Sequence, residues 1–268
     1  MVKEYPDHED LISLAFDASR IIKGDFYDDM KVSWKTDHTP VTGSDLAINE
    51  LVVAKFERDF PHITVIGEEG RRDVPDSEYW AILDPLDGTV PFTCGVSTST
   101  FCLAVMKGDQ PVSAVIRDPF CDRTWYASAG KGCFINKHPI HLRCMPLSFD
   151  KATVSLMWWP SSLGHLHEVC PELVRRNARW LNLGAVAICG GLIASGKLSA
   201  SIFPSSKAWE TAAMQLIVQE AGGVATDLHG QPISYGRDLK IEGHIMAADS
   251  MIHGQLVSIV KHVNGTSW

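Results

Sequence analysis

The chain lacks the segments that mark secreted and membrane-spanning proteins. Its first residues, MVKEYPDHEDL, are polar and acidic, with no basic stretch before an apolar core, so no signal peptide is predicted. No apolar run approaches the ~20 residues that a membrane-spanning helix needs. We therefore expect a cytoplasmic protein without membrane contact.

Paired cysteine motifs and basic clusters are missing too. The seven cysteines are scattered and form no CxxC motif, which favours reduced thiols over a disulfide framework or a zinc site. The formal net charge is −8, and an acidic chain without basic clusters argues against nucleic acid as a partner. An anionic small molecule is still compatible, because bound divalent cations can reverse the local field.

The composition that is present is that of an ordinary globular protein. The chain has 268 residues, of which 45% are hydrophobic and 21% charged, enough for one large core or two lobes. No internal repeat, low-complexity segment or long linker divides it. We expect one domain over residues 1–268, with an N-terminal lobe over about 1–145 and a C-terminal lobe over about 146–268.

Hydrophobic spacing predicts alternating helices and strands. Ser44 is interpreted as the N-cap of the second helix. The predicted helices are 8–23 with a stop at Gly24, 45–59, 161–178, 184–196, a helix from near Trp209 to Gly222-Gly223, and 250–262. The predicted strands are one at the start of 31–43, then 63–67, 80–83, 97–108, 110–119, 123–130, a hairpin after Gly130, 152–158, 198–203 and 244–248.

The stretch WAILDPLDGT, residues 80–89, carries the first chemical signal. Its apolar start predicts a buried strand that stops at Asp84, because Pro85 has no N–H to give a sheet. Asp84 and Asp87 then lie three residues apart, with the Leu86 carbonyl between them. Oxygen ligands of this kind favour a hard cation such as Mg²⁺. A plain turn is the alternative, since Asp, Pro and Gly are common in turns.

Gly88 and Thr89 follow these acids directly. Gly88 lets the backbone approach a ligand, because it has no Cβ. Thr89 brings a hydroxyl to the same place. A helical turn that starts near Thr89 would point free N–H groups at a phosphate.

Three further acids lie at the ends of predicted elements. Glu68 follows the strand 63–67, and Asp45 and Glu210 lie in the first turns of helices. Ends of strands are where sites gather in open α/β sheets. The alternatives are a solvated acidic loop for Glu68 and stabilisation of the helix dipole for the other two. Lys35 reads, by itself, as an exposed loop residue.

Three motifs in this order resemble the inositol monophosphatase family: GEEG at 67–70, LDPLDGT at 83–89 and WETAAMQLIVQEAGG at 209–223. WKTDHTPVTGSD at 34–45 matches the family's early segment. The family belongs to a lithium-sensitive, Mg²⁺-dependent phosphatase superfamily that includes fructose-1,6-bisphosphatases. The resemblance implies an α/β fold built as a layered αβαβα sandwich, and a homodimer.

The resemblance also implies roles for single residues. Thr89 and Asp45 match the pair that orients and deprotonates water, and Lys35 matches a basic residue near the phosphate. Glu210 stands where most relatives have Asp, so an altered metal geometry is expected. The implied ligands of two or three Mg²⁺ ions are Glu68, Asp84, the Leu86 carbonyl, Asp87 and Glu210.

The implied reaction is in-line attack of water on a phosphomonoester. Glu68 and the Thr89–Asp45 pair accept the proton of the water, and the N–H groups of Gly88 and Thr89 hold the phosphate oxygens.

The expected substrate pocket departs from the family pattern. Phe203 and Leu181 replace a Glu and an Arg that help to define the inositol pocket, and Ser205, Ser206 and Lys207 are expected to line a different one. We expect a small phosphorylated polyol or sugar, similar to inositol monophosphate, as the substrate. The alternatives are fructose-1,6-bisphosphate, histidinol phosphate, or a non-catalytic regulator that binds metal and phosphate.

Overall fold

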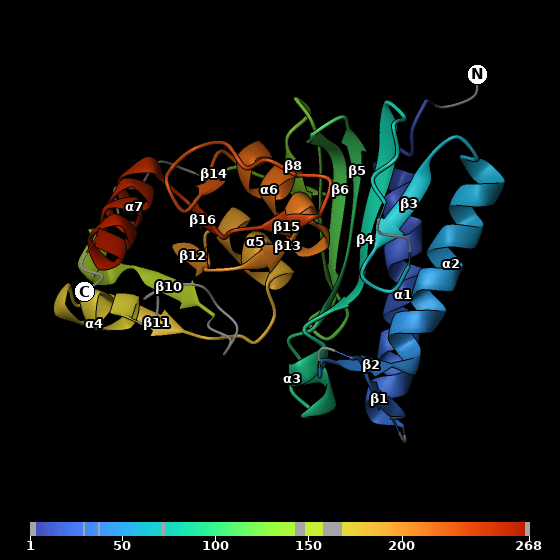
Figure 1. The fold of residues 1–268 in the computed structure, drawn as a ribbon, viewed down its shortest axis with the longest axis horizontal. Helices are drawn as coiled ribbons and strands as arrows, with labels where there is room; N and C mark the ends of the chain where they lie inside the picture. The colour runs from blue at the N-terminus through green and yellow to red at the C-terminus, as the bar shows by residue number, and fades with distance from the viewer. Residues whose placement is uncertain are drawn as a thin grey trace.

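The computed structural model describes residues 4–28, 30–36, 38–70, 73–142, 148–157 and 168–265. These residues form five layers, in the order helices, sheet, helices, sheet, helices (Figure 1). Helices α1 and α2 cover one outer face, α5 and α6 lie between the two large sheets, and α7 with α4 covers the other outer face. The expected αβαβα sandwich is therefore confirmed.

The longer helices are α1, α2, α6 and α7, and the others are short. They are α1 (His8–Tyr27), α2 (Gly43–Asp59), α3 (Thr89–Thr93), α4 (Val169–Arg175), α5 (Ala187–Ala194), α6 (Ala208–Glu220) and α7 (Ser250–Gly265), with a 3-10 turn at Phe149–Lys151.

The larger sheet has the order β3-β4-β5-β6-β7-β8-β9, in which β3 and β4 pair parallel and the other neighbours pair antiparallel. Its strands are β3 (Thr64–Gly67), β4 (Tyr79–Asp87), β5 (Thr100–Lys107), β6 (Gln110–Asp118), β7 (Arg123–Ser128), β8 (Cys133–Ile135) and β9 (His138–Ile140).

The second sheet has five strands in the order β11-β10-β12-β16-β14. They are β10 (Thr153–Leu156), β11 (Arg179–Leu181), β12 (Ala200–Phe203), β14 (Val224–Asp227) and β16 (His244–Ala247). Two small ladders complete the fold: β1 (Val32–Trp34) with β2 (Pro40–Thr42), and β13 (Ser206–Lys207) with β15 (Lys240–Ile241). Strands β11, β13, β14 and β15 are too short or too polar for the sequence pattern to predict them.

The middle layer explains the composition of its helices. α6 is buried along almost its whole length, because it has a sheet on either side. α1 instead buries one stripe, with Leu11, Ala15 and Ala18 against the sheet, and its other face meets solvent. This difference follows from the number of neighbours that each helix has, since a helix covered all round must be apolar all round.

The boundaries of several helices differ from the sequence-based expectation. α1 continues past Gly24 to Tyr27, because a single glycine costs only about 1 kcal/mol inside a helix. The N-cap of α2 is Thr42 and not Ser44. Of the helix predicted over 161–178, residues 161–167 lie outside the described residues, and the rest contains α4.

Strand β4 does not stop at Asp84 but continues to Asp87. The pairing with β5 changes register between Asp84 and Asp87. This irregularity accommodates Pro85, because a residue without an N–H is tolerated where the ladder is interrupted. The prediction that Pro85 ends the strand was therefore wrong, and both acids belong to one strand.

The described helices include none that is both long and apolar enough to cross a bilayer.

His244 on β16 provides a test of the packing of the second sheet. Its side chain is fully buried, and burial lowers its pKa to about 3. Below about pH 6.5 the imidazole binds a proton in the unfolded chain but not in the folded one. The unfolding free energy therefore falls as the pH drops from about 6.5 toward 3. We expect this one group to remove about 2 kcal/mol of unfolding free energy between pH 7 and pH 5.

Urea unfolding of the wild type and of His244→Gln at both pH values isolates this contribution. The variant should lose about 2 kcal/mol less than the wild type. Equal losses in the two proteins would contradict the assignment.

Candidate active site

The acids predicted from separate motifs approach one edge of the larger sheet. β3 and β4 run parallel, with Gly67 opposite Leu83, so the residues that follow them leave the sheet on the same side. A Cβ on Gly67 would lie 2.2 Å from the Leu83 carbonyl oxygen. Glycine therefore lets the two strands approach closely here, and Glu68 N donates to that same oxygen at 3.3 Å.

Asp84 and Asp87 are buried, at 1% and 4% exposure. Asp84 Oδ1 accepts from the Leu86 N–H at 3.1 Å. Asp87 accepts from the N–H groups of Val186 and Ala187, at 3.0 and 2.8 Å. A carboxylate that receives several N–H bonds is held in one orientation, so the start of α5 fixes Asp87.

Glu210 comes to this place from the first turn of α6. Its Oε2 accepts from the Lys207 N–H at 3.4 Å. Burial raises the pKa of Glu210 well above its usual range, and the charges of Asp87 and Glu68 raise it further. Since the interaction between two charges weakens as their separation grows, these three acids lie in one region.

Asp84 is influenced by the largest number of neighbouring acids. Its pKa is raised well above the ordinary value, first by burial and then by the other four acids: Glu68, Asp87, Glu210 and Asp45. Acids from four segments of the chain therefore lie near Asp84. Like charges held this close favour either a shared proton or a bound cation.

Asp45 occupies the N-terminal end of α2. Its Oδ2 accepts from the Thr42 N–H at 2.7 Å and from the Thr42 hydroxyl at 2.6 Å. Burial raises its pKa to about 7, and the charges of Glu69 and Glu68 act in the same direction. Within the described part of the chain, Asp45 Oδ1 is buried without a hydrogen-bond partner. It is an acceptor that a cation or a hydroxyl could use.

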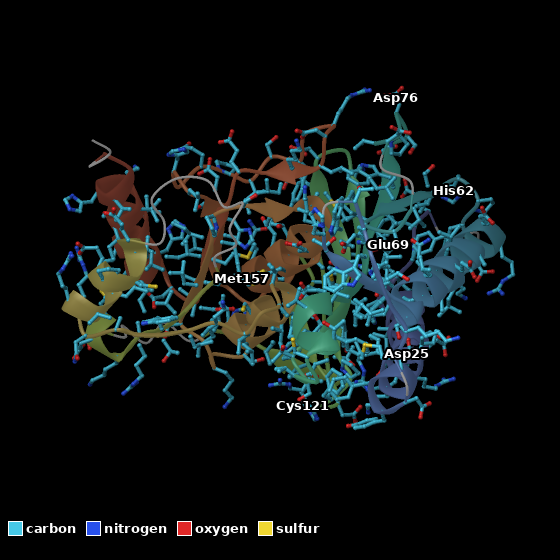
Figure 2. All side chains as sticks on the ribbon, turned by 60° about the horizontal axis from the view of Figure 1, so that its bottom comes forward. Asp25, His62, Glu69, Asp76, Cys121 and Met157 are labelled. Atoms are coloured by element: carbon cyan, nitrogen blue, oxygen red, sulfur yellow. The ribbon has the colours of Figure 1, made fainter. Side chains whose placement is uncertain are left out.

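Lys35 lies just beyond the exposed strand β1 and joins the acids through its ammonium group. Nζ is 2.6 Å from Glu68 Oε1 and also contacts Glu69 Oε1. Figure 2 shows Glu69 nearer the middle of the molecule than His62 or Asp76. The pKa of Lys35 is raised by these carboxylates, although burial alone would lower it. The pattern around Lys35 alone predicted an exposed loop residue, whereas Lys35 is paired with two carboxylates.

The carboxylates do not enclose an ion in their present orientations. Among the described residues, no three His, Cys, Asp or Glu side chains lie close enough together to do so. Each acid accepts from a local donor. Asp84 accepts from the Leu86 N–H, Asp87 from the two N–H groups of α5, Glu210 from the Lys207 N–H and Glu68 from Lys35 Nζ. The donor set still fits Mg²⁺, because it consists of carboxylate and carbonyl oxygens.

Gly88 follows β4 as the N-cap of α3, and Thr89 is the first residue of that helix. Gly88 has φ +83°, in the left-handed region, and a Cβ there would lie 2.6 Å from that of Ala185. Thr89 Oγ1 donates to the Leu86 carbonyl oxygen at 3.1 Å. A proton relay from Thr89 to Asp45 would require this hydroxyl to turn away from Leu86.

The four residues expected in the substrate pocket separate into two groups. Phe203 and Ser206 are buried, at 1% and 5% exposure, and Ser206 Oγ lies 3.1 Å from both Thr211 Oγ1 and His244 Nδ1. Ser205 is exposed. Lys207 is half-buried, and its Nζ lies 5.9 Å from the centroid of the Trp209 ring. Ser205 and Lys207 therefore have side-chain surface open to solvent, whereas Phe203 and Ser206 have almost none.

Sequence reasoning missed the groups that hold the acids. Thr42 could have been found, because Thr at 42 followed by Asp at 45 has the spacing of a capping box. Thr100, whose hydroxyl donates to Asp87 Oδ2 at 3.2 Å, had no such signal. The N–H donors of Val186 and Ala187 had none either, since a backbone group is the same in every residue type.

The chain matches the inositol monophosphatase family over residues 7–264. A 3'(2'),5'-bisphosphate nucleotidase of Aggregatibacter actinomycetemcomitans is 28% identical, over 85% of this chain and 87% of the relative. A histidinol-phosphatase of Mycobacterium tuberculosis is also 28% identical, over 86% and 88%. A solved IMPase/NADP phosphatase complexed with Mg²⁺ and phosphate has a TM-score of 0.81, at 20% identity and over 93% and 92% of the two chains, which shows a shared fold.

Gly88 offers a test of the close approach between β4 and the segment before α5. Gly88→Ala must relieve both a left-handed backbone and the 2.6 Å contact with Ala185. Gly132 has the same φ of +83° with no atom within 4 Å of its added Cβ, so Gly132→Ala measures the backbone cost alone.

We expect Gly132→Ala to lower the unfolding free energy by about 1 kcal/mol and Gly88→Ala by about 3 kcal/mol. Urea titration of both variants measures the difference. Similar losses would mean that the segment at Ala185 gives way freely.

Proposed function

Because the chain belongs to the inositol monophosphatase family, we propose that it is a Mg²⁺-dependent phosphatase acting on small phosphomonoesters. The family assignment gives the class of enzyme, a phosphoric monoester hydrolase. The observation that carries the proposal for this chain is the shared field of acids from β4, α6 and the end of β3, of which the two on β4 are buried. Such a cluster costs folding free energy unless a cation neutralises it.

The proposed Mg²⁺ ligands are four acids and one backbone carbonyl. They are Glu68, Asp84, the Leu86 carbonyl oxygen, Asp87 and Glu210. Bound Mg²⁺ would supply positive charge for the phosphate oxygens and lower the pKa of a coordinated water. Two or three ions, as the family resemblance implies, stay a prediction.

The side chains of this protein then have distinct tasks. Asp45, with a pKa of about 7 and an unpartnered Oδ1, is suited to accept a proton near neutral pH. Thr89 would connect the water to Asp45 once its hydroxyl leaves the Leu86 carbonyl. The N–H groups of Gly88 and Thr89 are proposed to hold the phosphate, and Lys35 to balance its charge.

For the rest of the substrate we propose Lys207 and Ser205 as the contacting residues. The Lys207 ammonium is close enough to lower the pKa of Glu210 against the effect of burial, so it lies beside the acids. A cation there suits a leaving group with hydroxyls or a second anionic group better than a neutral apolar one. This favours a sugar or polyol phosphate, and the relatives that hydrolyse a bisphosphate nucleotide or histidinol phosphate define the alternatives.

The proposal predicts phosphate release that needs both Mg²⁺ and Asp87. With a panel of phosphomonoesters, chelation of Mg²⁺ should abolish activity, and Asp87→Asn should lower kcat/KM at least about a hundredfold. Asp76→Asn, at an exposed aspartate paired with Arg237, is the matched control and should act like the wild type. Activity that survives chelation, or an equal effect of the two substitutions, would contradict the proposal.

A second prediction concerns selectivity. Lys207→Ala should change the ranking of inositol 1-phosphate, fructose 1,6-bisphosphate, histidinol phosphate and 3'-phosphoadenosine 5'-phosphate by about tenfold in relative kcat/KM, since one charged contact is worth ~1.5 kcal/mol or more. Lys131→Ala, at an exposed lysine in the turn between β7 and β8, should leave the ranking unchanged. An unchanged ranking in Lys207→Ala would remove Lys207 from the substrate pocket.

A further inference from the structure

Helix α5 is packed unusually tightly on two sides. A Cβ on Gly190 would lie 2.3 Å from Met214 Cγ of α6, and one on Gly191 would lie 2.4 Å from ring atom Cδ2 of Trp125. Real Cβ contacts do not come this close, so only glycine allows the helix backbone to touch both neighbours. The position of α5 is therefore set by α6 on one side and by the Trp125 ring on the other.

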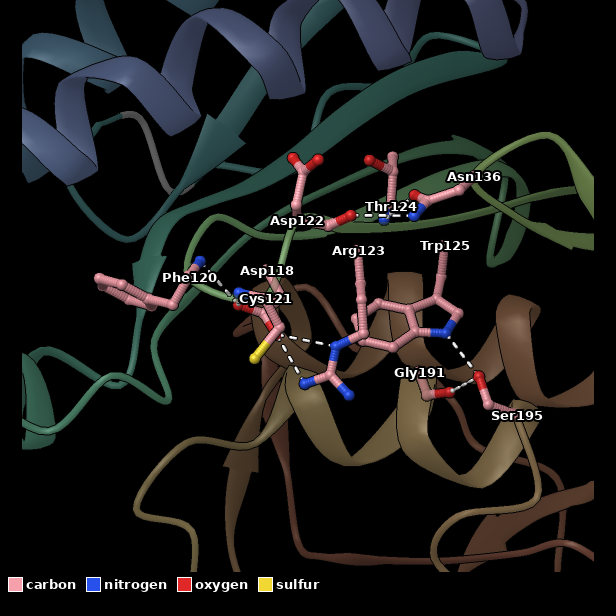
Figure 3. A network of polar contacts seen from close by, with 10 residues as sticks. All are labelled: Asp118, Phe120, Cys121, Asp122, Arg123, Thr124, Trp125, Asn136, Gly191 and Ser195. Atoms are coloured by element: carbon pink, nitrogen blue, oxygen red, sulfur yellow. Dashed lines mark hydrogen bonds and ion pairs between the residues drawn. The ribbon is translucent and has the colours of Figure 1, made fainter.

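Hydrogen bonds fix the C-terminal end of α5 to the same indole (Figure 3). Trp125 Nε1 donates to Ser195 Oγ at 2.7 Å, and Ser195 Oγ donates to the Gly191 carbonyl at 2.8 Å. Trp125 is itself held, because it is fully buried and the Arg123 guanidinium lies over its ring at 5.1 Å. Arg123 in turn binds Asp118 Oδ2 at 2.6 Å.

The opposite end of α5 holds an acid of the proposed metal site. Val186 and Ala187, where the helix starts, donate their N–H groups to the two oxygens of Asp87. A helix of eight residues is ~12 Å long and moves as one piece. A shift where Ser195 and Gly191 meet Trp125 thus moves the two donors on Asp87.

We propose that Trp125, Gly191 and Ser195 are positioning residues for Asp87, which act by setting where α5 places its first N–H groups. The inference rests on the proposed function, in which Asp87 is a Mg²⁺ ligand. Groups that orient a metal ligand without touching the metal commonly change affinity about ten- to a hundredfold when removed. A purely structural role predicts something else: lower stability with unchanged Mg²⁺ affinity.

The test measures Mg²⁺ binding by calorimetry, without substrate. Ser195→Ala removes the acceptor of the buried indole N–H, which must then move to find another partner. We expect its Kd for Mg²⁺ to rise about tenfold. Ser195→Thr keeps the hydroxyl and should bind within about twofold of the wild type. Gly191→Ala should bind still more weakly than Ser195→Ala, and if it fails to fold, the two Ser195 variants decide the question.

Val260→Ala supplies the control for lost stability. Val260 is fully buried in the core around α7, a hydrophobic cluster separate from that of α5, so its truncation lowers stability without touching α5. Its Kd for Mg²⁺ should equal that of the wild type. The inference is overturned if Ser195→Ala binds Mg²⁺ as tightly as the wild type, or if Val260→Ala weakens binding as much as Ser195→Ala does.

The same experiment separates the inference from its premise. If the wild type binds no Mg²⁺, or if Asp87→Asn binds it as tightly as the wild type, the proposed function fails and the inference fails with it. If Asp87→Asn loses binding and Ser195→Ala does not, the proposed function stands and only the inference is rejected.

Discussion

The mutual repulsion of buried carboxylates is the constraint around which this structure is arranged. Asp84, Asp87 and Asp45 are nearly inaccessible to water, and the charges of Glu68 and Glu210 raise the pKa of Asp84 further. In an unfolded chain these carboxylates would move apart, but here the strands and helices that carry them are packed together. The fold therefore stores an unfavourable interaction that a bound cation would relieve, as expected where binding sites sacrifice stability.

The groups that hold the acids come mostly from the backbone. The start of α5 supplies two N–H donors to Asp87, and Leu86 supplies one to Asp84. Lys35, from the N-terminal part of the chain, and Lys207, from the C-terminal part, add positive charge. Since backbone donors cannot reorient without moving a whole element, the geometry of the site depends on how closely α5 packs between α6 and Trp125.

Much of the layered fold could be predicted, because its strong signals are periodic. The alternation of apolar positions indicated α1, α2, α5, α6, α7 and the long antiparallel strands of the larger sheet. The end of β4 could not be predicted, since Pro85 is tolerated only through an irregular pairing with β5. Short strands such as β13 and β15, of two residues each, have no pattern of their own.

The sequence by itself determined which acids and glycines the chain carries, and the order of motifs that assigns it to its family. Those properties depend on residue types and on their spacing, which the sequence gives directly. Only the tertiary structure decided which groups face the acids, Lys35 on Glu68 and α5 on Asp87, and that Ser206 faces His244 instead. These contacts join residues 33 to 100 positions apart, and such separations leave no local pattern, because burial and orientation arise when the layers pack together.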